Sequence, residues 1–155
     1  MHANCHAVDA ELARAGLDGR VHVLDEAAPT AAAAAALVGV EVGAIANSLV
    51  FATAEGKPLL VLTSGAHRVD TAKVAALIGT AVLRRATPEF VYEATGQRIG
   101  GVAPVGHPQP IRTIVDVALE AFPQIWAAGG IPHAVFPATF AELVRLTGGQ
   151  VADVA

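Results

Sequence analysis

The feature that most constrains the fold is a pair of apolar, β-branched segments joined by a short turn. Residues 48–53 and 58–63 are rich in Val, Leu and Thr, and residues 54–57 between them read Ala-Glu-Gly-Lys. Two strand-like runs separated by a short turn that contains Gly predict a β-hairpin. An antiparallel pair of strands is therefore the starting point for any fold of this chain.

Helical signals alternate with further strand-like segments along the rest of the sequence. Residues 30–39 form an Ala-rich run between Thr30 and Gly39, and Thr87-Pro88-Glu89 is typical of a helix start. By the same signals we expect helices at 9–15, 71–79, 87–96 and 139–146, and strands at 20–24, 81–83, 111–115, 124–127 and 133–136. Residues 96–110 hold four Gly and three Pro and cannot form a regular element. The pattern predicts a single α/β (α+β) domain over residues 1–155, with a mixed, mostly antiparallel sheet.

Composition is that of one compact domain, because 54% of the residues are hydrophobic and 15% are charged. The longest apolar run, residues 30–40, is too short to cross a membrane, and Asp9 and Glu11 interrupt the place of a signal-peptide core. We therefore expect a cytoplasmic protein without membrane contact, with residues 1–8 as a flexible terminus. The net charge of −4 argues against a broad basic face for nucleic acid. One interpretation of the apolar surplus is the face of a homodimer.

Motifs for a nucleophile, a phosphate loop or a metal site are missing. The serines are Ser48 and Ser64, and neither lies in a G-x-S-x-G segment. Residues 101–107 have the glycine spacing of a phosphate loop, but His107 and Pro108 stand where Lys and Ser or Thr are required. A single Cys supplies neither a disulfide nor a Cys-based zinc site. We expect no metal and no other cofactor.

Two glycine-rich segments remain as candidate binding loops. In Gly100-Gly101-Val102-Ala103-Pro104, glycine lets the backbone approach a ligand closely and Pro104 fixes the loop, so that N–H groups can face a carbonyl or a phosphate. The alternative is a tight connection between strands. Gly129-Gly130, which follows Trp126, offers the same two interpretations, with Trp126 as a core residue.

Five elements, taken in order, resemble the YbaK/EbsC family, the free-standing relatives of the editing domain inserted in bacterial prolyl-tRNA synthetases. They are Asn47-Ser48-Leu49-Val50-Phe51, Thr95-Gly96, Gly100-Gly101-x-x-Pro104-x-Gly106, Asp116 and Gly129-Gly130. The resemblance runs from Arg20 to Val154. It implies a mixed sheet curled into an open barrel with helices around it. It also implies a trans-acting enzyme that hydrolyses the ester of a mischarged tRNA, typically Ala or Cys on the proline tRNA.

The resemblance further implies a pocket for the amino acid and the terminal adenosine of the tRNA acceptor end. Asn47 and Gly100 would be the catalytic positions, with water as the nucleophile, helped by a ribose hydroxyl of the substrate. The implied substrate-binding residues are Ser48, Ser64, Gly101, Val102, Pro104, Gly129, Gly130 and His133. Basic residues that could contact the tRNA end, or simply be solvated, are Arg68, Lys73, Arg84, Arg85, Arg98 and Arg112.

Asn47 departs from the family pattern, because many members have Lys at this position. A neutral amide lacks the charge assistance that roughly doubles the strength of a hydrogen bond. If the Lys stabilises developing negative charge, its loss costs on the order of 3 kcal/mol, or about 10² to 10³ in rate. Two functions therefore stay open: a deacylase for a small amino acid with an Asn-type site, or a module that has lost turnover and binds aminoacyl-adenosine, a nucleotide or a protein partner.

Overall fold

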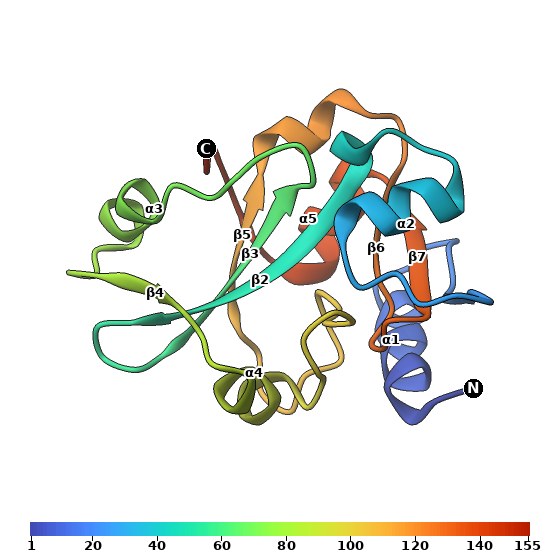
Figure 1. The fold of residues 1–155 in the computed structure, drawn as a ribbon, viewed down its shortest axis with the longest axis horizontal. Helices are drawn as coiled ribbons and strands as arrows, with labels where there is room; N and C mark the ends of the chain where they lie inside the picture. Colours follow the sequence, from blue (N-terminus) through green and yellow to red (C-terminus); the bar gives the residue numbers. More distant parts are fainter.

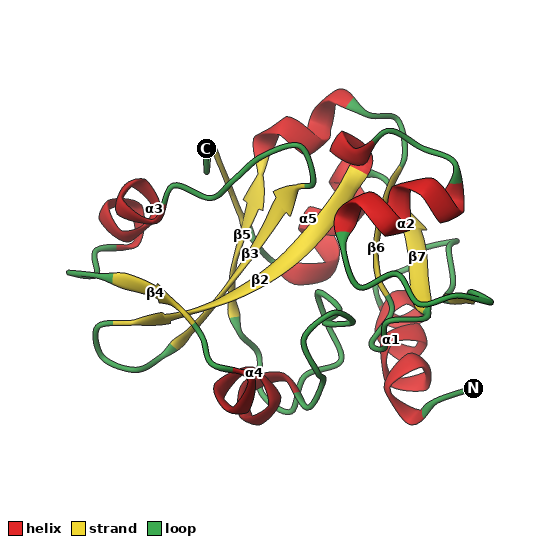
Figure 2. Ribbon diagram, in the orientation of Figure 1, coloured by secondary structure: helices red, strands yellow, loops and turns green.

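The computed structural model describes residues 1–155 as one eight-stranded sheet with five α-helices around it (Figures 1 and 2). The helices are α1 (Ala3–Arg14), α2 (Ala31–Val38), α3 (Thr71–Ile78), α4 (Pro88–Thr95) and α5 (Phe140–Thr147), with 3-10 turns η1 (Val42–Ala44) and η2 (Val117–Ala121). The strands are β1 (His22–Val23), β2 (Ile45–Thr53), β3 (Pro58–Ser64), β4 (Leu83–Arg85), β5 (Arg112–Asp116), β6 (Ile125–Ala128), β7 (Ala134–Ala138) and β8 (Gln150–Ala152).

The sheet has the order β1-β7-β6-β2-β3-β5-β8, and β4 pairs with β2 beside this path. The pairs β1–β7, β2–β3, β2–β4 and β6–β7 are antiparallel, whereas β2–β6, β3–β5 and β5–β8 are parallel. The predicted hairpin is β2–β3, in continuous register from Ala46↔Ser64 to Ala52↔Pro58. The predicted α/β fold with a mixed, mostly antiparallel sheet is confirmed.

Helix ends follow the predicted capping residues. The hydroxyls of Thr30 and Thr87 accept the backbone N–H groups three residues on, at 3.1 Å and 3.2 Å, and begin α2 and α4. Gly39 and Gly96 end these helices in the left-handed conformation, which glycine adopts without a steric cost. None of the helices combines the length and the apolar character that a membrane span requires.

The N-terminus differs from the prediction. α1 begins at Ala3, six residues before the predicted helix, so residues 3–8 of the expected flexible terminus lie in this helix. Cys5 and Val8 are fully buried, and the Asn4 side chain donates to the Gly130 carbonyl at 3.1 Å. The start of α1 was missed because His2, which is a rare cap, accepts the Asn4 N–H where the sequence has no Ser, Thr or Asp. β8 was also missed, and β4 lies two residues beyond its predicted place.

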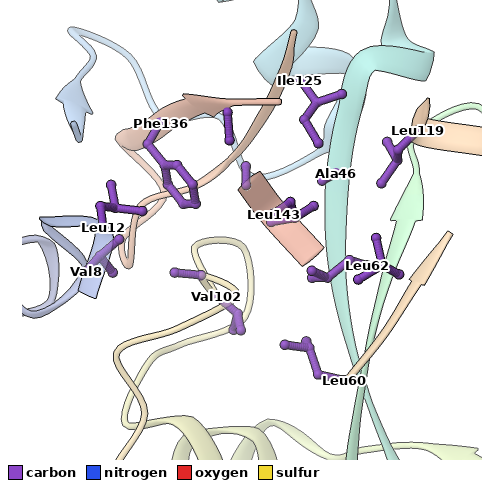
Figure 3. Close-up of a cluster of buried hydrophobic side chains, with 14 of the residues drawn as sticks. Val8, Leu12, Ala46, Leu60, Leu62, Val102, Leu119, Ile125, Phe136 and Leu143 are labelled. Carbon is purple, nitrogen blue, oxygen red and sulfur yellow. The ribbon is translucent and has the colours of Figure 1, made fainter. Parts of the chain in front are cut away.

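Each face of the sheet has its own cluster of apolar side chains, set by strand alternation. Ala46, Val50, Leu60 and Leu62 face the larger cluster, which α1, α4, α5 and the loop after α4 cover. Figure 3 shows side chains from α1, the sheet and α5 gathered around the loop that carries Val102. The opposite face packs against α3 in one cluster and α2 in another. Both faces of β2 and β3 are therefore buried, and residues 47–50 of β2 lie between its ladders with β6 and β4.

Candidate active site

A cavity of about 310 Å³ lies at a gap in the sheet, along one edge of β2. On this edge β2 pairs with β6 at Ile45 and Ala46 and with β4 from Phe51 to Thr53, so residues 47–50 lie outside both ladders. α2 and β6 lie on one side of the gap, and β4 and α4 lie on the other (Figure 1). The cavity is lined by residues from both faces of the sheet, because the missing strand opens a passage between them.

The backbone of Ser48 points to this open edge. In an antiparallel pair, the N–H and C=O groups of alternate residues point to opposite edges. The Ile45 carbonyl accepts from Gly65 on the β3 side, whereas the Val50 carbonyl accepts from Ala86 on the β4 side at 3.1 Å. Ser48 lies two residues before Val50, so its backbone N–H and C=O point to the same edge of β2 as those of Val50. Because Ser48 lies outside the β4 and β6 registers, these two groups face the cavity. The strand edge thus offers a backbone donor and an acceptor to a ligand.

The side chain of Ser48 adds a polar atom without a partner. Its Oγ is buried and makes no hydrogen bond, which is the sole case of this kind in the structure. A buried hydroxyl without a partner costs about 1–3 kcal/mol. A buried polar atom of this kind calls for a partner, such as a ligand or an ordered water.

Asn47 lines the same cavity from the neighbouring position on β2 and is half-buried. Its position in register is opposite Thr63 of β3, and no hydrogen bond of the structure uses its side-chain amide. The amide N–H₂ and C=O are therefore available to a ligand, and the N–H₂ group is a neutral donor where a Lys would be a charged one.

Gly100 forms the wall that faces β2, on the loop after α4. Its φ of +96° lies in the left-handed region, and Pro29 and Pro132 lie 3.5–3.9 Å from where a side chain would begin. The next residue packs still more tightly: a Cβ on Gly101 would lie 2.3 Å from the Ile131 carbonyl carbon. Gly100 therefore faces the cavity, while Gly101 holds the loop against the turn between β6 and β7.

A buried glutamine fixes the rest of this loop. The Gln97 carboxamide accepts the Ala103 N–H at 2.7 Å and donates to the Val105 carbonyl at 3.2 Å. His107 completes the loop with its Nε2 2.8 Å from the Ala103 carbonyl. Burial lowers the pKa of His107 below its ordinary value, partly offset by this hydrogen bond, so the neutral ring donates from Nε2.

Four of the residues expected at the site line the cavity, namely Asn47, Ser48, Gly100 and Val102. The other six do not: Ser64, Gly101, Pro104, Gly129, Gly130 and His133. Ser64 belongs to a buried network at the far end of β3, where its hydroxyl donates to Gly43 and its N–H donates to Asp116. Pro104 is buried, and His133 is exposed on the turn before β7.

The two glycines of the turn before β7 serve packing. The Gly129 N–H donates to the Ala134 carbonyl at 2.7 Å, and a Cβ on Gly129 would lie 2.9 Å from the Ala134 side chain. Gly130 has a φ of +108° and would meet Asn4 of α1 at 2.9 Å. These contacts therefore agree with the interpretation of residues 129–130 as part of a tight turn.

Other cavity residues, apart from Arg85 among the basic candidates, did not stand out in the sequence. Pro29 and Thr30 bring the start of α2 to the cavity, and Trp126 lines it from β6 while its ring meets His22 edge-on at 5.4 Å. Arg85 lines the opposite end, from the last position of β4. No local motif marks these positions, because each depends on which strands border the gap. The basic character of Arg85 was the one available signal.

Comparison with known proteins agrees with this architecture. The family model of the aminoacyl-tRNA editing domain matches residues 25–146. A solved structure described as a proposed trans-editing enzyme for prolyl-tRNA synthetase is 45% identical, with a TM-score of 0.92 over 99% of this chain and 98% of that one. Protein YwhH of Bacillus subtilis, described as uncharacterized, is 30% identical over 118 residues, which is 76% of this chain and 74% of YwhH.

Part of a larger enzyme is also similar. The proline–tRNA ligase of Limosilactobacillus fermentum is 32% identical over 116 residues, which is 72% of this chain and 19% of the ligase. This chain thus corresponds to a small part of that ligase. Because the family model spans most of the chain and the similar structure spans nearly all of it, the protein belongs to the aminoacyl-tRNA editing domain family.

Proposed function

We propose that this protein hydrolyses, in trans, the ester of a tRNA mischarged with a small amino acid such as Ala or Cys, on the proline tRNA or a related one. The observation that carries the proposal is the apolar cavity at the open edge of β2, which holds Asn47, Ser48 and Gly100 together. A cavity of about 310 Å³ lies at the small end of ligand sites, which run from about 300 to 1,000 Å³. It suits a small side chain joined to one nucleoside.

The cavity supplies donors for the ester carbonyl. The Ser48 N–H faces the open edge of β2, and the Asn47 side chain and Gly100 line the same cavity. Donors held in place at the carbonyl oxygen stabilise the negative charge that develops when water attacks, because they need no reorganisation during the reaction. Hydroxyl groups of the ribose would assist the attacking water, which agrees with a reaction that requires no protein nucleophile.

Selectivity would come from the size of the cavity. One methylene in an apolar pocket changes the free energy of binding by about 1–3 kcal/mol. Sixteen of the lining residues are hydrophobic, so a larger side chain would have to displace packed groups. Purified protein should therefore deacylate tRNA charged with Ala, Cys or Ser faster than the spontaneous rate, when tested on proline, alanine and threonine tRNAs. No acceleration for any of them would refute the proposal.

A second function is favoured by one observation, the neutral amide at position 47. A site without the charged donor could hold aminoacyl-adenosine or a nucleotide without turning it over. Asn47→Lys separates the two functions. If the protein is an active deacylase with an Asn-type site, the variant should lose deacylation activity. If it is a binding module, Asn47→Lys should raise hydrolysis from the spontaneous rate by about 10² or more.

A further inference from the structure

Arg85 is the single charged side chain among the 22 residues that line the cavity. The lining contains no Asp and no Glu, although the protein as a whole is acidic, with a net charge of −4. A positive charge without an acidic residue in the same lining attracts anions. The end of the cavity where Arg85 lies therefore favours an anionic group of a ligand.

The position of Arg85 is set by β4. It pairs with Phe51 in register, and its guanidinium lies over the Phe51 ring at 5.8 Å from the centroid. Arg85 takes part in none of the ion pairs and none of the side-chain hydrogen bonds of the structure. The side chain is exposed, so it stands at the mouth of the cavity, with all of its N–H donors free. Its neighbour Arg84 pairs with Ala52 and does not line the cavity.

In the proposed substrate, phosphate groups are the anions that the Arg85 guanidinium could bind. In an aminoacyl ester the carboxyl group of the amino acid is esterified and its amine is cationic, so the ground-state anions are the phosphates of the RNA. The phosphate nearest the ester is the one on the 5′ oxygen of the terminal adenosine. A guanidinium binds phosphate with two parallel hydrogen bonds, which suits Arg better than a neutral side chain.

We propose that Arg85 binds the 5′ phosphate of the terminal adenosine and so provides the positive charge that Asn47 lacks. This inference rests on the proposed substrate. The ester would then lie deeper, beside Asn47, Ser48 and Gly100, while the RNA leaves the cavity past β4. The charge acts in binding and placing the substrate, and the reaction itself uses the neutral donors of β2.

Two matched substrates test the inference: the alanyl ester of adenosine and the alanyl ester of adenosine 5′-monophosphate. The wild type should prefer the phosphorylated ester by about fivefold in kcat/KM, the upper range for one ion pair at an exposed site. Arg85→Gln should remove this preference, so that the variant hydrolyses the two esters with equal kcat/KM. Arg84→Gln, the control on the adjacent position, should keep the preference, and Arg85→Lys should restore part of it.

Three results would overturn the inference: no preference in the wild type, a preference that survives Arg85→Gln, or an equal loss on both esters. The last would place Arg85 at the developing oxyanion. Binding of adenosine 5′-monophosphate and of adenosine, measured by calorimetry on the same variants, gives the answer without turnover. A protein that hydrolyses neither ester, yet loses its preference for the monophosphate in Arg85→Gln, would support the role of Arg85 in binding, while the charged tRNAs decide the deacylase proposal.

Discussion

Replacing Gln97 should detach the loop that forms one wall of the cavity. The Gln97 side chain is 1% exposed and bridges two backbone groups of the loop, the Ala103 N–H at 2.7 Å and the Val105 carbonyl at 3.2 Å. The orientation of the carboxamide is fixed by chemistry, because its oxygen must face the N–H and its nitrogen must face the carbonyl. Its backbone is held in turn by the Thr95 hydroxyl, which accepts the Gln97 N–H at 3.0 Å.

Gln97→Leu keeps a side chain of similar size but leaves both backbone groups without partners. Ala103 is fully buried, so its unpaired N–H should cost about 1–3 kcal/mol. Val105 is half-buried, and water can replace part of its lost bond. We therefore expect the free energy of unfolding to fall by about 3 kcal/mol in total.

Urea unfolding followed by the fluorescence of Trp126, the one tryptophan of the chain, measures this change. Gln109→Leu is the matched control, because Gln109 is exposed in the same Gly- and Pro-rich segment and should change stability by less than about 0.5 kcal/mol. Gln97→Glu keeps the acceptor and donates only when protonated, so its deficit should shrink as the pH is lowered. A Gln97→Leu variant as stable as the control would refute the role of Gln97 in holding this loop.

Two further predictions concern single side chains. Burial lowers the pKa of His107 in the folded state, so at a pH below about 6.5 the unfolded chain binds a proton that the folded one does not, and stability should fall as the pH is lowered from 7.5 to 5.5. His107→Gln should show a smaller fall in the urea midpoint over this range, and an equal fall would contradict the assignment. Ser48→Ala removes a buried hydroxyl without a partner, so the free protein should become more stable by about 1 kcal/mol in urea unfolding, while kcat/KM for aminoacyl-tRNA decreases. A less stable Ser48→Ala protein would show that the hydroxyl has a partner after all.

The parts of the fold that the sequence predicted well are those with local signals. Thr87 followed by Pro88 begins α4, and Gly39 ends α2, because capping acts within one turn of helix. The β2–β3 hairpin is likewise specified by its own turn. β8 carries no such signal: Gln150–Ala152 is a strand only because β5 offers it a parallel edge, and that edge lies more than thirty residues away in the sequence.

The residues of the candidate site also divide into those with a local sequence signal and those that depend on tertiary contacts. Asn47 and Gly100 could be found because they lie in short segments that resemble a family pattern, and both line the cavity. Gly129 and Gly130 lie in an equally glycine-rich segment, yet their glycines are needed for close packing against β7 and α1. A glycine pair in a sequence shows that something approaches the backbone closely, but whether that is a ligand or another part of the chain depends on tertiary contacts.

The gap in the sheet leaves a hydrogen-bond donor that does not depend on the side chain at position 47. Some hydrogen-bond donors of the site belong to side chains, and a substitution removes them directly. Another is the backbone N–H of Ser48, which is available as long as β6 and β4 leave this edge of β2 unpaired. A donor from the backbone is kept under any substitution that preserves the strand, and it is already fixed in direction. In the proposed complex, Arg85 would place the phosphate and the Ser48 N–H would polarise the ester. A single Lys could combine two tasks, binding the phosphate and polarising the ester, which this site would divide between two residues. The paired esters test the first task, and the Asn47→Lys variant tests the second.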